Sequence, residues 1–103
     1  MESQDFYCEY ILNNKIEFSK IKETDNVLAY YHTKPSYKTH VVVITKEHIT
    51  ALSEIKDLNI IREIFEVILQ VVKELNLTDY KVINNSGKYQ DSKHLHFHIV
   101  SDN

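Results

Sequence analysis

Residues 94–100 (HLHFHIV) constrain the fold more than any other segment, because histidine alternates there with apolar side chains. Successive side chains of a strand point to opposite faces, whereas a helix would scatter both sets around its axis. The alternation therefore predicts a strand. We expect three of its residues in the core and three histidines along one exposed face, namely Leu95, Phe97 and Ile99 against His94, His96 and His98.

A row of three imidazoles can divide several chemical tasks between its members. Imidazole is a nucleophile, a hydrogen-bond donor or acceptor and a general acid or base near neutral pH, since its pKa is about 6.5. We predict that the central ring, His96, attacks an electrophilic centre such as phosphorus. A neighbour would donate to the developing negative oxygens, and another group would fix the tautomer of the attacking ring. The pattern thus indicates acyl or phosphoryl transfer without a metal.

Metal binding is the main alternative for the same histidines. A His-x-His pair on a strand can place two ring nitrogens on one zinc or copper ion, and His32, His40 and His48 lie upstream as further ligands. The chain has one cysteine and no HExxH motif, so paired thiolates and a zincin helix are both lacking. The pattern favours nucleophilic catalysis over metal binding.

Length and composition set broad limits on this protein. Its 103 residues predict a single domain, 1–103, with a modest core. The net charge of -3 argues against nucleic acid and anionic membranes as partners. The N-terminus lacks an apolar signal segment, and no apolar run approaches the ~20 residues of a membrane span. Cys8 has no second cysteine to pair with, which suits a reducing compartment, so we expect a cytoplasmic protein.

The remaining periodicity predicts the order α, β, β, β, α, β, β, an α+β fold. The expected elements are a short helix over 5–13, strands over 18–23, 26–31 and 41–44, a long helix over 60–75, and strands over 80–84 and 94–100. The strand over 41–44 is β-branched throughout and should be buried on both sides. A second apolar stripe on the long helix, Ile60, Val67 and Val71, indicates either a broad core face or a subunit interface.

Three blocks of the sequence resemble the histidine-triad (HIT) family. Residues 94–100 match its signature, in which three histidines alternate with apolar residues. Residues 35–49 (PSYKTHVVVITKEHI) resemble its proline loop, histidine, apolar strand and Lys-x-His segment, and residues 8–16 and 25–30 resemble its first helix and second strand. The similarity covers nearly the whole chain and is closest to the small Hint branch. It implies a HIT-like fold with a five-stranded antiparallel sheet, one long helix and a short N-terminal helix, and a homodimer formed through the long helix.

The resemblance also implies a role for each matching residue. His96 corresponds to the nucleophile that attacks the α-phosphorus of a nucleotide and forms a covalent nucleotidyl-histidine, from which water releases the nucleoside monophosphate. His98 corresponds to the residue that contacts the phosphate oxygens and assists the leaving group, and His94 and His40 to the histidines that order the site. Asn84 matches an asparagine that reaches the phosphate or leaving-group region, although an asparagine here could equally begin a turn.

Two departures from the family pattern affect the expected substrate contacts. His32 stands where many relatives place an aspartate that grips the ribose hydroxyls, and imidazole cannot accept two hydroxyl hydrogen bonds. The loop before the triad carries Gln90 as expected, but Asp91 replaces a hydroxyl residue and would repel phosphate. Ser92 supplies the hydroxyl if the register shifts by one residue. Gly87 remains as the flexible hinge of this loop.

A third departure concerns zinc. Some bacterial relatives carry Cys-x-x-Cys near Cys8 as part of a structural zinc site, and Ile11 replaces the second cysteine here. The resemblance therefore implies no metal and no cofactor, with Cys8 as a core thiol.

The expected function is hydrolysis of a purine nucleotide or nucleoside phosphoramidate by a metal-independent histidine nucleophile. Cleavage of dinucleoside polyphosphates is an alternative within the family. A noncatalytic nucleotide-binding module is a second alternative, motivated by His32 and Asp91 at substrate-facing positions. A metal-binding protein that uses the same histidines is a third.

Overall fold

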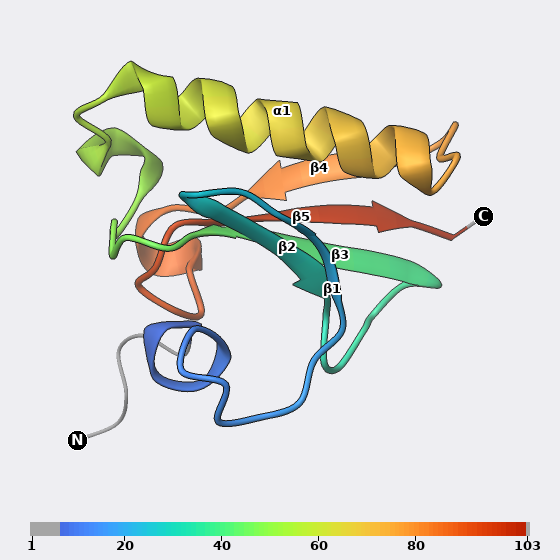
Figure 1. Ribbon diagram of the computed structural model, residues 1–103, viewed down its shortest axis with the longest axis horizontal. Coiled ribbons are helices and arrows are strands. Elements are labelled where there is room, and N and C mark those ends of the chain that lie inside the picture. The colour runs from blue at the N-terminus through green and yellow to red at the C-terminus, as the bar shows by residue number, and fades with distance from the viewer. Residues whose placement is uncertain (1–6, 103) are drawn as a thin grey trace.

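One antiparallel sheet of five strands organises the molecule. The computed structural model describes residues 7–102, apart from the side chain of Glu9. Its strands are β1 (Lys20–Glu23), β2 (Val27–Tyr31), β3 (Thr39–Thr45), β4 (Lys81–Asn84) and β5 (His96–Ser101), in the spatial order β1-β2-β3-β5-β4. Helix α1 (Leu58–Glu74) lies along one face, and the single-turn helix η1 (Tyr7–Ile11) lies on the opposite side (Figure 1). The predicted α+β class and antiparallel five-stranded sheet are confirmed.

The alternation of side chains sends two apolar clusters to the two faces of the sheet. The cluster under α1 joins residues of three strands, and Leu95 just before β5, to the helix: Val27, Ala29, Val41, Val43, Leu95, Phe97 and Ile99 with Ile64, Val67, Ile68 and Val71. A smaller cluster on the other face consists of Tyr7, Ile11, Leu28, Tyr30, Val42 and Ile44. Strand β3 contributes to both clusters, so its predicted burial on two sides is confirmed.

Helix α1 begins at a cap that the periodicity did not reveal. The Asp57 side chain accepts a hydrogen bond of 3.0 Å from the backbone N–H of Asn59, which starts the helix at Leu58, two residues before the predicted Ile60. Asn76 takes a left-handed conformation, with φ of 55°, just after the helix ends. Among residues 7–102, no helix combines the length and the hydropathy needed to cross a membrane.

The second apolar stripe of the helix belongs to the core. Val67 and Val71 are fully buried against the sheet, so the broad core face is the correct interpretation of these residues and the subunit interface is not. Three other apolar side chains of α1 remain exposed, namely Leu58, Phe65 and Leu69 at 73%, 42% and 59% of their surface.

Several predicted boundaries move by one or two residues. The first helix is shorter than predicted and spans Tyr7–Ile11, while Asp5 and Phe6 lie outside the described residues. Strand β5 begins at His96, two residues after the predicted start, because a bend over residues 91–94 and the unpaired position of Leu95 in the sheet ladder precede it. A short 3-10 helix, η3 (Gly87–Tyr89), occupies the loop between β4 and β5.

Candidate functional site

The histidine face of β5 is covered, which corrects the prediction that it is exposed. His94 is 0% exposed and His96 is 4% exposed. The Tyr7 ring of η1 lies over both, with centroid distances of 5.7 Å to His94 and 4.9 Å to His96. The alternation of a strand separates two faces but cannot say what covers each of them, and here η1 closes the histidine face. His98 is half-buried at the edge of this cover.

The tautomer of His96 follows from a single backbone contact. Its Nδ1 lies 2.7 Å from the carbonyl oxygen of His94, and a carbonyl only accepts, so Nδ1 carries the proton and donates it. Burial lowers the pKa of His96, while the hydrogen bond to His94 partly opposes that shift. The ring is therefore neutral near pH 7, and its Nε2 keeps a lone pair. An imidazole in this state is a nucleophile.

A second chain of hydrogen bonds fixes His98. The backbone N–H of Ser36 donates to Nδ1 of His40 over 3.1 Å, so the proton of the neutral His40 ring is on Nε2. This Nε2 lies 2.9 Å from Nδ1 of His98 and donates to it, which leaves the proton of His98 on its Nε2. Burial lowers the pKa of both rings to about 4. His98 consequently presents an N–H donor beside the lone pair of His96.

The backbone around His96 is held from two further directions. Nε2 of the buried His94 lies 2.7 Å from the carbonyl of Thr45 and donates to it. The side-chain amide of Asn84 donates to the carbonyl of His96 over 2.9 Å. The structure thus brings Asn84 to the histidine cluster through the main chain of β5. His40, His94, His96 and His98 all come together as predicted.

Hydrogen bonds made by Gln90 and Lys93 hold the loop between β4 and β5. The Gln90 amide donates to the carbonyls of Thr50 and Ser92 over 2.8 and 3.2 Å, and its oxygen accepts from the N–H of Gly87 over 3.1 Å. Lys93 donates to the Gly87 carbonyl over 2.8 Å. Gly87, the expected hinge of this loop, takes a left-handed conformation with φ of 64°. The predicted contacts of Gln90 and Ser92 with substrate stay predictions.

Asp91 lies close enough to the histidines to act on them through its charge. Its carboxylate is exposed and raises the pKa of His96, against the larger lowering that burial produces. The expected repulsion between this carboxylate and a phosphate stays a prediction.

His32 stands in the same cluster and not apart on the surface. Its ring centroid lies 4.4 Å from that of His40 and 6.1 Å from that of His98. The N–H of Lys34 donates to Nδ1 of His32 over 2.9 Å, and burial lowers the pKa of His32. Four of the rings thus form one continuous row from His96 through His98 and His40 to His32.

A group of possible metal ligands lies on the other side of the buried His94. Sγ of Cys8 is 3.5 Å from Nδ1 of His94 and 3.8 Å from Nδ1 of His48, and the three ligand atoms lie within 4.8 Å of one another. Cysteine and histidine suit zinc, but a closed structural site takes four ligands and Ile11 supplies none. Cys8 is half-buried, so it is not the core thiol that we expected. The convergence of His48 on Cys8 was missed, although the Lys-x-His segment was visible.

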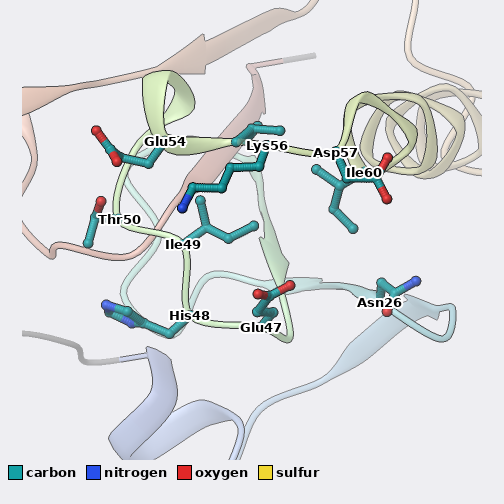
Figure 2. Close-up of a pocket in the computed structure, with 10 residues that line it drawn as sticks. Asn26, Glu47, His48, Ile49, Thr50, Glu54, Lys56, Asp57 and Ile60 are labelled. Atoms are coloured by element: carbon teal, nitrogen blue, oxygen red, sulfur yellow. The ribbon is translucent and has the colours of Figure 1, made fainter.

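A separate cavity of about 430 Å³ lies between the β3–α1 connection and the start of α1. Figure 2 shows its lining, which comes mainly from the chain between Glu47 and Ile60, with Asn26 from the turn after β1. Of the three possible metal ligands, only His48 lines this cavity. None of the four predicted catalytic histidines lines it. The candidate site is therefore the histidine row and not this cavity.

Comparison with known proteins gives a consistent result. The sequence model of one protein family, described as the HIT domain, matches residues 13–103. An uncharacterised HIT-like protein of Helicobacter pylori is 35% identical over 97 residues, which cover 90% of this chain and 92% of that protein. The adenosine 5′-monophosphoramidase of Schizosaccharomyces pombe is 32% identical over 96 residues, 91% of this chain and 71% of that protein. A histidine triad protein from Clostridium difficile has a structure with a TM-score of 0.83 at 36% identity, covering 97% of this chain and 92% of its own.

Proposed function

Because this chain belongs to the histidine-triad family, we propose that it hydrolyses nucleoside 5′-phosphoramidates through a covalent intermediate on His96. Family membership supports nucleotide hydrolysis in general, and one relative is named an adenosine 5′-monophosphoramidase. The observation that carries the proposal is the 2.7 Å contact between Nδ1 of His96 and the carbonyl of His94, which leaves the Nε2 lone pair available for attack. Purine nucleotides are the proposed substrates.

The reaction proceeds in two displacements at phosphorus. The Nε2 lone pair of His96 forms a bond to the α-phosphorus while the P–N bond of the substrate breaks, and the amine leaves with a proton taken from solvent. Water then attacks the same phosphorus and releases a proton to solvent, the P–Nε2 bond breaks, and the nucleoside monophosphate departs. The Nε2–H of His98 donates to the phosphate oxygens, where negative charge increases in both transition states. His40 acts through His98 by fixing its tautomer, so it is a positioning residue.

We further propose that the protein is a homodimer that uses the uncovered edge of the fold. β4 is an outer strand of the sheet, and its Val82 is 39% exposed. The exposed Leu58, Phe65 and Leu69 of α1 add apolar surface. An exposed apolar patch on a strand edge and a helix suits a second copy of the chain. Light scattering should give twice the chain mass, and Leu69→Lys should shift it to the monomer. A monomeric wild-type protein would contradict this proposal.

Metal binding is a second candidate function, favoured by the convergence of Cys8, His48 and His94. These residues would hold zinc by one thiolate and two imidazoles, which would fix His94 and with it the carbonyl that orients His96. Stoichiometric zinc in protein purified without an affinity tag, lost in Cys8→Ser and His48→Ala, would support this candidate. Metal-free protein that retains its fold and activity would contradict it. Cys8 is the single cysteine of the sequence, which suits a reducing compartment, and we propose a cytoplasmic location.

The deciding experiment is hydrolysis of a fluorogenic adenosine 5′-phosphoramidate in the presence of EDTA. Turnover by the wild type and not by His96→Ala, with both proteins folded, is the expected result. A diadenosine polyphosphate should be tested in parallel, and faster cleavage of that substrate would support the alternative within the family. Nucleotide binding without turnover of any substrate would contradict the proposal and support a noncatalytic module.

A further inference from the structure

We propose that the aromatic ring of Tyr7 stabilises, by a cation–π contact, the positive charge that His96 acquires in the covalent intermediate. This inference rests on the proposed function, because it assumes that Nε2 of His96 bonds to phosphorus. It gives the aromatic cover of η1 a part in the first chemical step, in addition to its place in the core.

The His96 ring becomes cationic when its Nε2 bonds to phosphorus. Nδ1 keeps its proton in the 2.7 Å hydrogen bond to the carbonyl of His94, because a carbonyl accepts a hydrogen bond but is too weak a base to remove the proton. The ring therefore gains one positive charge as its lone pair is shared with phosphorus. It loses that charge in the second step, when the P–Nε2 bond breaks and the electron pair returns to the nitrogen.

The polar groups around His96 do little to balance this charge. Within residues 7–102, no carboxylate forms a hydrogen bond with the ring, whose one hydrogen bond goes to a neutral carbonyl. Asp91 is the carboxylate whose charge reaches His96, but it is exposed on the loop before β5, where water weakens its effect. Burial disfavours a charged ring, and a second protonated imidazole would add repulsion. The neighbouring imidazoles are those of His32, His94 and His98.

Tyr7 supplies an electron-rich ring where the charge develops. Its centroid lies 4.9 Å from that of His96 at a tilt of 42°, within the ~6 Å over which an aromatic ring attracts a cation. Tyr7 is 6% exposed and His96 is 4% exposed, so little water screens the contact, and cation–π attraction is strongest in such desolvated places. Tyr7 also belongs to the smaller apolar cluster with Ile11 and Tyr30, which holds its ring in place before the reaction begins.

The contact favours one step of the reaction over the other. His96 is neutral in the free protein and cationic in the intermediate, so the attraction to Tyr7 increases on the way to the intermediate and speeds its formation. Hydrolysis of the intermediate begins with the cationic ring and returns it to the neutral form. Loss of the Tyr7 ring should therefore slow the first step and leave the second step at least as fast.

The test follows single turnovers of a fluorogenic adenosine 5′-phosphoramidate. Release of the fluorescent amine reports formation of the P–Nε2 bond, and release of AMP after acid quenching reports its hydrolysis. Tyr7→Leu should slow amine release by about 3- to 30-fold, whereas Tyr7→Phe, which retains the aromatic face, should stay within about twofold of the wild type. Three further variants carry mono-, di- or trifluorophenylalanine in place of Tyr7. Fluorine withdraws electrons from the ring face with little change of shape, so amine release should slow progressively along this series.

The failures of the two proposals can be told apart. Equal rates of amine release across the fluorinated series would overturn the inference and leave the proposed function intact, even if Tyr7→Leu is slow, because the ring would then act by packing. Slowing of both steps to the same extent would overturn it as well. Circular dichroism of each variant checks that the fold is retained. If the wild type hydrolyses no phosphoramidate, the proposed function fails and the inference fails with it.

Discussion

The two faces of β5 arise from the same alternation of side chains but have different roles. Phe97 and Ile99 pack under α1 among other apolar residues, and contact with neighbours of suitable size is all that they require. His96 and His98 face η1, and each has one ring nitrogen engaged by a defined partner. The apolar face thus contributes stability, whereas the histidine face sets the protonation of named nitrogen atoms. We expect substitutions on the two faces to separate these contributions.

The largest effect should come from His96→Ala. The variant lacks the nitrogen that attacks phosphorus, so kcat/KM should fall by at least ~10⁴-fold, as for other nucleophile deletions. The partner of its Nδ1 is the backbone carbonyl of His94, just before β5, and thermal unfolding should show a folded protein. Steady-state kinetics measures the loss of kcat/KM, with the protein concentration determined by absorbance and not by activity. Residual activity within tenfold of the wild type would exclude His96 as the nucleophile.

Ile99→Ala is the matched substitution on the opposite face. Ile99 is 0% exposed under α1, so its truncation should lower the free energy of unfolding by about 2–5 kcal/mol. The hydrogen bonds of the histidine face should remain, and kcat/KM should stay within about twofold at temperatures well below the transition. Urea denaturation and kinetics on the same preparation measure both quantities. A large kinetic defect with little loss of stability would show that the faces do not act separately.

His40→Leu should reduce activity less than the loss of the nucleophile does. It removes the donor that fixes the tautomer of His98, and the loss of one such hydrogen bond corresponds to roughly a 10- to 100-fold decrease in kcat/KM. His40→Gln, whose amide N–H can donate to the same nitrogen, should recover part of the activity. Equal defects in the two variants would indicate a packing role for His40 and not a positioning role.

The buried imidazoles should also make stability depend on pH. Folding lowers the pKa of His40 and His98 to about 4, so between about pH 6.5 and pH 4 the unfolded chain binds more protons than the folded chain. The free energy of unfolding should therefore decrease as the pH falls through this window, with no further decrease from these residues below it. Denaturation curves for the wild type and His98→Gln measure the effect. His98→Gln should show a shallower slope, and an unchanged slope would contradict the assignment.

Asp91→Asn should have the smallest effect. The exposed carboxylate raises the pKa of His96 and repels phosphate, and a single exposed charge contributes ~1 kcal/mol or less. We expect KM for an anionic substrate to decrease about two- to fivefold and the acid limb of the activity profile to move to lower pH. The difference in KM between the wild type and Asp91→Asn should become smaller as salt is added. A rise in KM would instead give Asp91 a direct role in binding.

The sequence predicts this fold well because local periodicity encodes most of it. The alternation over residues 94–100 and the β-branched run of β3 place two adjacent inner strands, and the spacing of apolar residues places α1. The errors have particular causes. The Asp57 cap extends the helix, and the bend that ends at His94 delays β5.

The predicted site was less complete because it depends on contacts between distant residues. Nothing in a period of two reveals that Tyr7 covers His96, nor that Cys8 lies against His48 and His94. The sequence also could not predict the direction of each hydrogen bond. The tautomers of His40 and His32 depend on their partners, the N–H groups of Ser36 and Lys34. Residue identity was thus predictable, whereas protonation was not.

The most direct test of this account is the tautomer of His96, measured by ¹⁵N NMR of the imidazole rings at neutral pH. The account predicts a neutral His96 with its proton on Nδ1 and an unprotonated Nε2, beside a neutral His98 with its proton on Nε2. A His96 ring that carries its proton on Nε2, or that is doubly protonated above pH 6.5, would contradict the proposed nucleophile.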